Sequence, residues 1–177
     1  KILESRGVPI RMLLIGDGPL STRWHALARG HGSIVMPGQP GQAEIEAAAA
    51  IADVGLAPYV PEAPFSDNLP NHLLQYFSSR LPVATTIGGQ LSRLLREQDC
   101  GWQYPEGNPA ALADQLTELA QNRKRLAAMG ANALELHRRR FRGHRIYARM
   151  STALLELCRR PDRIPPEPSR VVGVPTL

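Results

Sequence analysis

The residues best suited to chemistry lie between Asp67 and Gly89. This segment combines a polar loop, a helix that begins at Pro70, a buried strand over Pro82–Thr86 and a Gly88-Gly89 turn. The N-terminus of a helix presents free backbone N–H groups and the positive end of its dipole, which suit a phosphate. A glycine turn lets a ligand approach the backbone closely. The segment therefore predicts a site for an anionic, nucleotide-like ligand.

For three polar side chains of this segment the sequence leaves two alternative roles. His72 falls in the first turn of the predicted helix, where it either hydrogen-bonds a phosphate or lies at the surface. Asp67 precedes the helix and Gln75 lies further along it, so both reach one ligand only if the loop folds back over the helix. Otherwise Asp67 is an N-cap-like turn residue and Gln75 is a surface side chain.

Several other kinds of chemistry lack support in the sequence. Cys100 and Cys158 stand far apart without CxxC spacing, and no histidine pair has the spacing of metal ligands, so we expect no metal site and no disulfide framework. No local arrangement indicates a Ser–His–Asp or Cys–His nucleophile. Gly16-Asp-Gly-Pro19 is similar to a dinucleotide fingerprint, but Ser21 replaces its third glycine, which favours a tight strand-to-helix turn.

Length and charge narrow the function further. A chain of 177 residues with 43% hydrophobic residues predicts one domain with a sizeable core. No apolar run approaches the ~18 residues that span a bilayer, and the start of the sequence does not resemble a signal peptide. Residues 123–163 contain twelve Lys and Arg and three Asp and Glu, so this segment is strongly basic. These helices could meet nucleic acid or anionic lipid, but aromatic residues are sparse there, which favours a solvated face and no nucleic-acid partner.

Strand and helix signals alternate along the chain, which is typical of βα units and a parallel sheet. Strands are expected at residues 10–15, 33–36, 53–57, 82–86 and 101–104. Helices are expected at residues 20–29, 42–51, 70–79, 91–98, 110–122, 124–139 and 142–159. The predicted fold class is α/β, a Rossmann-like parallel sheet with flanking helices. We expect one domain over residues 1–160 and a Pro-rich tail over residues 161–177.

A series of short motifs, each common alone, becomes specific through order and spacing. In chain order they are Leu14-Ile-Gly-Asp-Gly-Pro19, Ile34-Val-Met-Pro-Gly38, Ala52-Asp-Val-Gly-Leu-Ala-Pro58, Leu69-Pro-Asn-His-Leu-Leu-Gln-Tyr76, Leu81-Pro-Val-Ala84, Gly88-Gly89 and Cys100-Gly-Trp-Gln-Tyr-Pro105. Residues 1–141 thereby resemble the C-terminal, donor-binding domain of the retaining family-four glycosyltransferases, also called group 1. The resemblance implies one half of a GT-B architecture, in which two Rossmann-like domains face a cleft. It also implies a first strand before Lys1, central to the sheet.

The resemblance also implies roles for individual residues. Two glutamates separated by seven residues mark the family's donor site, and their positions here are Asp67, toward the sugar at the catalytic centre, and Gln75, at the ribose. Gln75 lacks the charge of a glutamate, so its hydrogen bonds to the ribose should be weaker. The implied neighbours of the sugar and diphosphate are Asn68, Leu69, Pro70, Asn71 and His72, with the turn Gly88 and Gly89. The turn that borders the base is implied at Val35, Met36, Pro37 and Gly38.

The implied function is transfer of a sugar from a nucleotide diphosphate sugar to a glycan or lipid-linked acceptor, with retention. No metal or other cofactor is expected, and the acceptor would bind through a separate N-terminal domain, so the present chain alone should be inactive. The expected location is the cytoplasm, either free or peripheral at the inner face of the membrane. Two alternatives stay open: a nucleotide-sugar epimerase of the same architecture, and a degenerate, non-catalytic nucleotide-sugar-binding domain.

Overall fold

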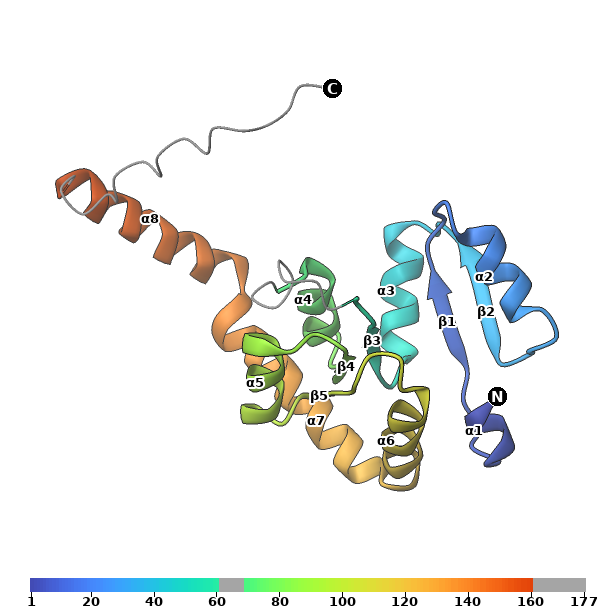
Figure 1. Cartoon of the computed structure of the whole chain (residues 1–177). Coiled ribbons are helices and arrows are strands. Elements are labelled where there is room, and N and C mark those ends of the chain that lie inside the picture. The colour runs from blue at the N-terminus through green and yellow to red at the C-terminus, as the bar shows by residue number, and fades with distance from the viewer. Residues whose placement is uncertain (61–68, 161–177) are drawn as a thin grey trace, which may run out of the picture. The chain divides into compact units, whose positions relative to one another are not determined.

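The computed structural model describes residues 1–60 and 69–160 (Figure 1). Asp67, Asn68 and the predicted tail over residues 161–177 lie outside these described residues. The chain divides into two compact units, Lys1–Arg139 and Arg140–Leu177, and each unit is described by itself. The predicted boundary after residue 160 stays a prediction.

The strands of the first unit form two parallel sheets. In one sheet, β1 (Met12–Ile15) pairs with β2 (Ile34–Gly38), with Met12 opposite Ile34. In the other sheet, β3 (Gly55–Ala57), β4 (Val83–Thr85) and β5 (Gly101–Gln103) pair in that order. The predicted α/β class with parallel strands is confirmed. Each observed strand overlaps its predicted range, and β2 runs two residues past the predicted end.

Helices alternate with these strands. In chain order they are α1 (Ile2–Ser5), α2 (Ser21–Ala28), α3 (Gln42–Ile51), α4 (Asn71–Ser78), α5 (Gly89–Glu97), α6 (Pro109–Gln121) and α7 (Arg123–Leu136), followed by a π-helical turn at His137–Phe141. Asn108 caps α6 by accepting a hydrogen bond from the backbone N–H of Ala111 at 3.0 Å. Helix α5 begins at Gly89, two residues earlier than predicted, so the glycine turn is part of the helix start.

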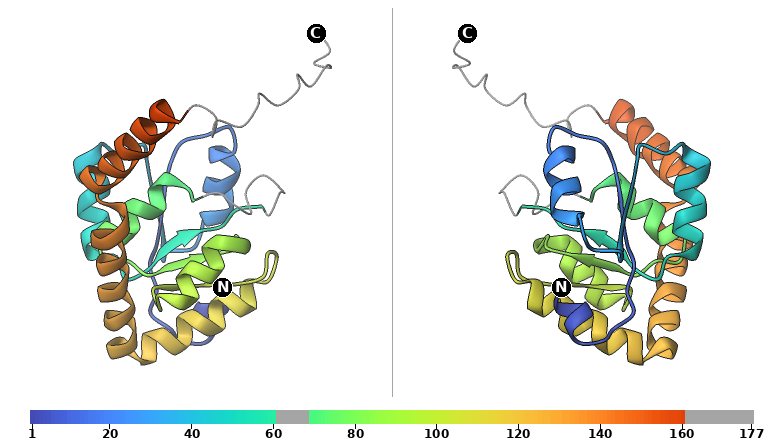
Figure 2. Two further views of the ribbon diagram at one scale, coloured as in Figure 1. Left: turned by 90° about the vertical axis from the view of Figure 1, so that its left-hand side faces the viewer. Right: turned by 90° about the vertical axis from the view of Figure 1, so that its right-hand side faces the viewer.

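The core of the first unit surrounds β4. Its side chains Val83 and Ala84 are fully buried, as are Leu73 and Phe77 of α4 and Leu95 of α5. Helix α4 packs on β3 and β4, α5 packs on β5, and α7 packs on α4. Figure 2 shows these helices gathered around the three strands. This packing fixes the carboxyl ends of β3 and β4 beside the start of α4.

The β1–β2 sheet is covered less well. The side chains of Leu13, Ile15 and Val35 are 45%, 41% and 45% exposed, although strands of a parallel sheet normally bury such residues. Among the described residues no strand joins β1 to β3. The doubly wound order 3-2-1-4-5-6 would place its first strand between these two strands. Among the described residues, β2-β1 and β3-β4-β5 therefore match the two flanks of that order.

The described part of the second unit contains α8 (Gly143–Arg159). Its apolar residues Ile146, Met150, Leu154 and Leu157 recur at helical spacing and are exposed within that part. Among the described residues no helix combines the length and the apolar character needed to cross a bilayer.

Candidate functional site

The start of α4 presents backbone N–H groups at the end of the connection from β3. Pro70 precedes the helix, and among the described residues no side chain caps its N-terminal N–H groups. Asn71 and His72 form the first turn, and they follow the long connection from the end of β3. Uncapped N–H groups of a helix start seek an anion or another acceptor. The structure thus provides the helix N-terminus on which the predicted phosphate site depends.

Two tyrosines enclose His72. The ring of Tyr59 stacks on the imidazole with centroids 5.8 Å apart, and the Tyr59 hydroxyl lies 3.4 Å from His72 Nδ1. Tyr76, one turn further along α4, meets the imidazole edge-on with ring centroids 5.5 Å apart. Burial lowers the pKa of His72 below its usual value, which favours the neutral imidazole. The imidazole is therefore positioned by its neighbours and is not simply a surface side chain.

The sequence analysis did not include either tyrosine. The spacing of four residues between His72 and Tyr76 places them on one helix face and could have indicated that pair. Tyr59 lies 13 residues before His72 in an irregular segment, so no local pattern predicts their contact.

Two threonines tie the ends of the strands together. Thr85 Oγ1 donates a hydrogen bond to the Ala57 carbonyl at 2.9 Å, which links β4 to β3. The backbone N–H of Tyr59 donates to Thr86 Oγ1 at 2.8 Å, and the Thr86 hydroxyl donates to the Tyr59 carbonyl. Because Gly88 follows closely, these bonds bring Tyr59 and the glycine turn to one edge of the sheet. Ligands of parallel α/β sheets bind at this edge.

A hollow of about 300 Å³ opens at the same edge. Its lining comes from the segments after the three strands: Pro58, Tyr59 and Val60 after β3, Thr86 after β4, and Tyr104, Glu106, Gly107, Asn108, Pro109 and Leu112 after β5. Gly89 has a φ of +62°, a conformation that glycine adopts without strain. The backbone around this turn can therefore lie close to a ligand.

Gln75 lies half-buried on α4, which is inconsistent with the alternative of a plain surface side chain. Its Nε2 is buried and has no hydrogen-bond partner among the described residues. Such a group needs an explanation, because buried amides are nearly always paired. Asp67 and Asn68 lie outside the described residues, so their approach to Gln75 stays a prediction.

The predicted base-side residues occupy a different sheet. Val35, Met36, Pro37 and Gly38 form the larger part of β2, and the Gly38 carbonyl accepts a hydrogen bond from the N–H of Gly16 at 2.9 Å. The structure does not group them with His72 and Thr86, which belong to the three-stranded sheet and its helices. Leu69 and Pro70 directly precede α4 as expected.

Comparison with known proteins shows which family the chain belongs to. The family model described as glycosyl transferases group 1 matches residues 1–122. The chain belongs to this family. Among curated relatives, WcaL of Escherichia coli (strain K12), provisionally named a colanic acid biosynthesis glycosyltransferase, is 29% identical over 123 residues. The WcaL protein of Salmonella typhimurium (strain LT2) is 28% identical over the same length. The match covers 67% of this chain and 30% of each relative.

Solved structures agree with this membership at the level of the fold. HepE of Anabaena in complex with UDP superposes with a TM-score of 0.69 at 18% identity, covering 84% of this chain and 41% of HepE. WaaG, a glycosyltransferase involved in lipopolysaccharide biosynthesis, gives a TM-score of 0.61 at 20% identity, covering 76% of this chain and 35% of WaaG. The fold of this family member is thus the Rossmann-like half of a GT-B glycosyltransferase.

Proposed function

We propose that this chain is the donor-binding part of a glycosyltransferase that uses a nucleoside diphosphate sugar. The start of α4, which no side chain of the described residues caps, is the observation on which the proposal chiefly rests, and the Gly88-Gly89 turn follows β4 at the same edge of the sheet. Family membership supplies the reaction class. The HepE structures, determined with UDP and with UDP-glucose, support a nucleotide sugar as the ligand of such a fold.

In this proposal different residues contact the diphosphate, the ribose, the sugar and the base of the donor. The N–H groups of Asn71 and His72 hold the diphosphate, and the Gly88-Gly89 turn admits it to the backbone. The buried amide of Gln75 meets the ribose, and Asp67 accepts hydrogen bonds from hydroxyls of the sugar at the reacting centre. The β2 segment from Val35 to Gly38 borders the base. No metal enters this scheme.

The finer features of the reaction belong to the same proposal. The sugar is transferred with retention to a hydroxyl of a glycan or lipid-linked acceptor, which binds through a second domain of a longer protein. The protein acts in the cytoplasm, and the arginines near α8 allow peripheral contact with the inner face of the membrane. The chain spans about a third of the length of the relatives that it matches, so we expect the purified 177-residue chain to bind donor without turnover.

One observation favours a second candidate, a nucleotide-sugar-binding domain without catalytic activity. Gln75 stands where the family's pattern has an acid, so hydrogen bonding to the ribose lacks the strength that a charge would add. Measurement of sugar transfer and of donor hydrolysis by the full-length protein separates the two candidates. Analysis of the product separates transfer from epimerisation.

The donor site is tested by calorimetry with UDP and UDP-glucose on the full-length protein. Asp67→Ala should weaken binding of UDP-glucose more than binding of UDP, since only the sugar contact is lost. Asp53→Ala is the matched control, because Asp53 lies before β3 at the opposite edge of the sheet and pairs with Arg123 at 2.6 Å. The proposed site would be contradicted if the wild-type protein, Asp67→Ala and Asp53→Ala bound UDP with one affinity and UDP-glucose with one affinity.

A further inference from the structure

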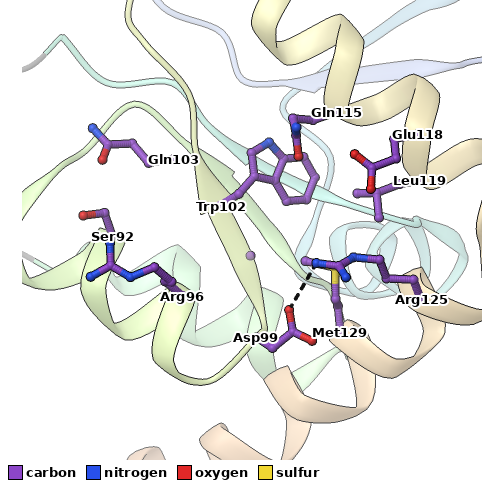
Figure 3. Close-up of a pocket in the computed structure, with 11 residues that line it drawn as sticks. Ser92, Arg96, Asp99, Trp102, Gln103, Gln115, Glu118, Leu119, Arg125 and Met129 are labelled. Carbon is purple, nitrogen blue, oxygen red and sulfur yellow. Dashed lines mark ion pairs between the residues drawn. The ribbon is translucent and has the colours of Figure 1, made fainter.

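A second hollow, of about 380 Å³, lies beside β5 between α5, α6 and α7 (Figure 3). Apolar side chains form its floor: Trp102 of β5, Leu119 of α6 and Met129 of α7. Leu119 and Met129 are almost fully buried, and Trp102 packs against them. The hollow therefore has a stable base that includes an aromatic ring.

Planar polar side chains surround this floor. In Figure 3 Arg96 lies on one side of Trp102, while Glu118 and Arg125 lie on the other. Gln115 stands one turn before Glu118 on α6. Amide, carboxylate and guanidinium groups together offer both hydrogen-bond donors and acceptors. A purely apolar ligand would leave these groups without partners.

The charges around the hollow balance. Arg96 and Arg125 are matched by Asp99 and Glu118 among the lining residues, and Arg125 Nη2 lies 3.7 Å from Asp99 Oδ1. A site for phosphate or a nucleotide would need an excess of positive charge or a row of free backbone N–H groups. The balance instead favours a neutral ligand that is rich in hydrogen-bonding groups.

Trp102 provides an independent observation. Its indole Nε1 is buried, and this donor has no hydrogen-bond partner among the described residues. An indole N–H can only donate, so the missing partner is an acceptor. Gln115 and Glu118 are exposed side chains of α6. Both can therefore turn toward a bound ligand while an oxygen of that ligand reaches Nε1.

We propose that this hollow binds a neutral saccharide of one or two sugar rings. A pyranose ring has an apolar C–H face that fits an indole and a rim of hydroxyls that both donate and accept. The volume lies near the lower end of the range for small-ligand pockets, which suits this size. The inference goes beyond the proposed donor function, because it assigns a glycan contact to the domain that holds the nucleotide sugar.

The test follows the indole N–H of Trp102 by NMR in the full-length protein labelled at tryptophan nitrogen. The resonance is identified by its loss in Trp102→Phe. Maltose, cellobiose and lactose are the probes, and UDP and inorganic phosphate are titrated separately. We expect at least one disaccharide to shift the resonance in a saturable manner. UDP and phosphate should leave it in place, whether or not UDP binds elsewhere.

Two glutamines of α6 give a matched pair of variants. Gln115→Ala should weaken the disaccharide about threefold to tenfold, the effect of one lost hydrogen bond. Gln121→Ala, exposed on the same helix but outside the hollow, should leave the affinity unchanged. The proposal is overturned if none of the three disaccharides shifts the resonance, if both variants bind equally well, or if phosphate or UDP produces the shift instead.

Discussion

The unpartnered amide of Gln75 leads to a prediction in which stability and ligand binding change in opposite directions. Gln75 Nε2 is buried without a hydrogen-bond partner among the described residues. In the ligand-free protein an unsatisfied buried donor costs about 1–3 kcal/mol of stability. Methionine has nearly the same length and shape and carries no polar hydrogen. Gln75→Met is therefore expected to raise the free energy of unfolding by about 1–3 kcal/mol in the absence of ligand.

The size of the effect makes it measurable. For a protein of 177 residues, 1 kcal/mol corresponds to a change of about 2–4 °C in Tm. Gln75→Glu should have the opposite effect on the ligand-free protein, because it places a carboxylate where the amide is already buried. The assay is thermal and urea unfolding of the full-length protein, with Gln121→Met on the exposed side of α6 as the control.

Added UDP completes this experiment. A ligand that binds only the folded protein raises its stability by an amount that depends on the dissociation constant. If Gln75 meets the ribose, UDP should stabilise the wild-type protein more than the Gln75→Met variant. Loss of stability in ligand-free Gln75→Met would show that the amide already has a stabilising partner. Equal stabilisation of both proteins by UDP would show that Gln75 does not contribute to the binding of UDP.

Three further predictions concern single side chains. Burial lowers the pKa of His72 in the folded protein below its ordinary 6.5. At pH values between this lowered pKa and 6.5, the unfolded chain therefore binds more protons than the folded one. Stability should fall as pH decreases through this window, and the fall should be shallower in His72→Phe when Tm is measured from pH 7.5 downward. Burial raises the pKa of Cys100 to about 12, so a thiol reagent should label exposed Cys158 first, and Cys158→Ser should remove this fast phase. A Cβ at Gly130 would collide with the Arg80 carbonyl. Gly130→Ala should therefore destabilise the fold by about 1–3 kcal/mol, measured by urea unfolding. An unchanged unfolding midpoint would show that α7 can shift to make room for the methyl group.

Much of the fold could be predicted because its signals are local. The run Met12–Ile15 and the segment Val83–Thr85 are short and apolar, as strands of parallel sheets commonly are. Asn108 followed by a proline marks the start of α6, and the observed cap confirms it. Such features depend on a few adjacent residues, so a single sequence contains them in full.

The candidate site depends more on contacts that no local pattern contains. The stacking of Tyr59 on His72 joins an irregular segment to a helix, and Thr86 fixes that segment from another strand. The burial of the Gln75 amide is equally a product of packing, because a glutamine in the middle of a short helix is usually exposed. The hollow beside Trp102 needs three helices in their final positions, and its lining was therefore not predicted.

The division between the two sheets bears on how the donor site is assembled. The proposed base contacts lie on β2, whereas the proposed phosphate and ribose contacts lie on α4, which packs on the three-stranded sheet. A strand between β1 and β3 would hydrogen-bond to both sheets and fix the distance between these contacts. The same strand would cover apolar side chains such as Leu13, which are now about half exposed. Under the proposed function, completion of the sheet and assembly of the donor site would then be one event.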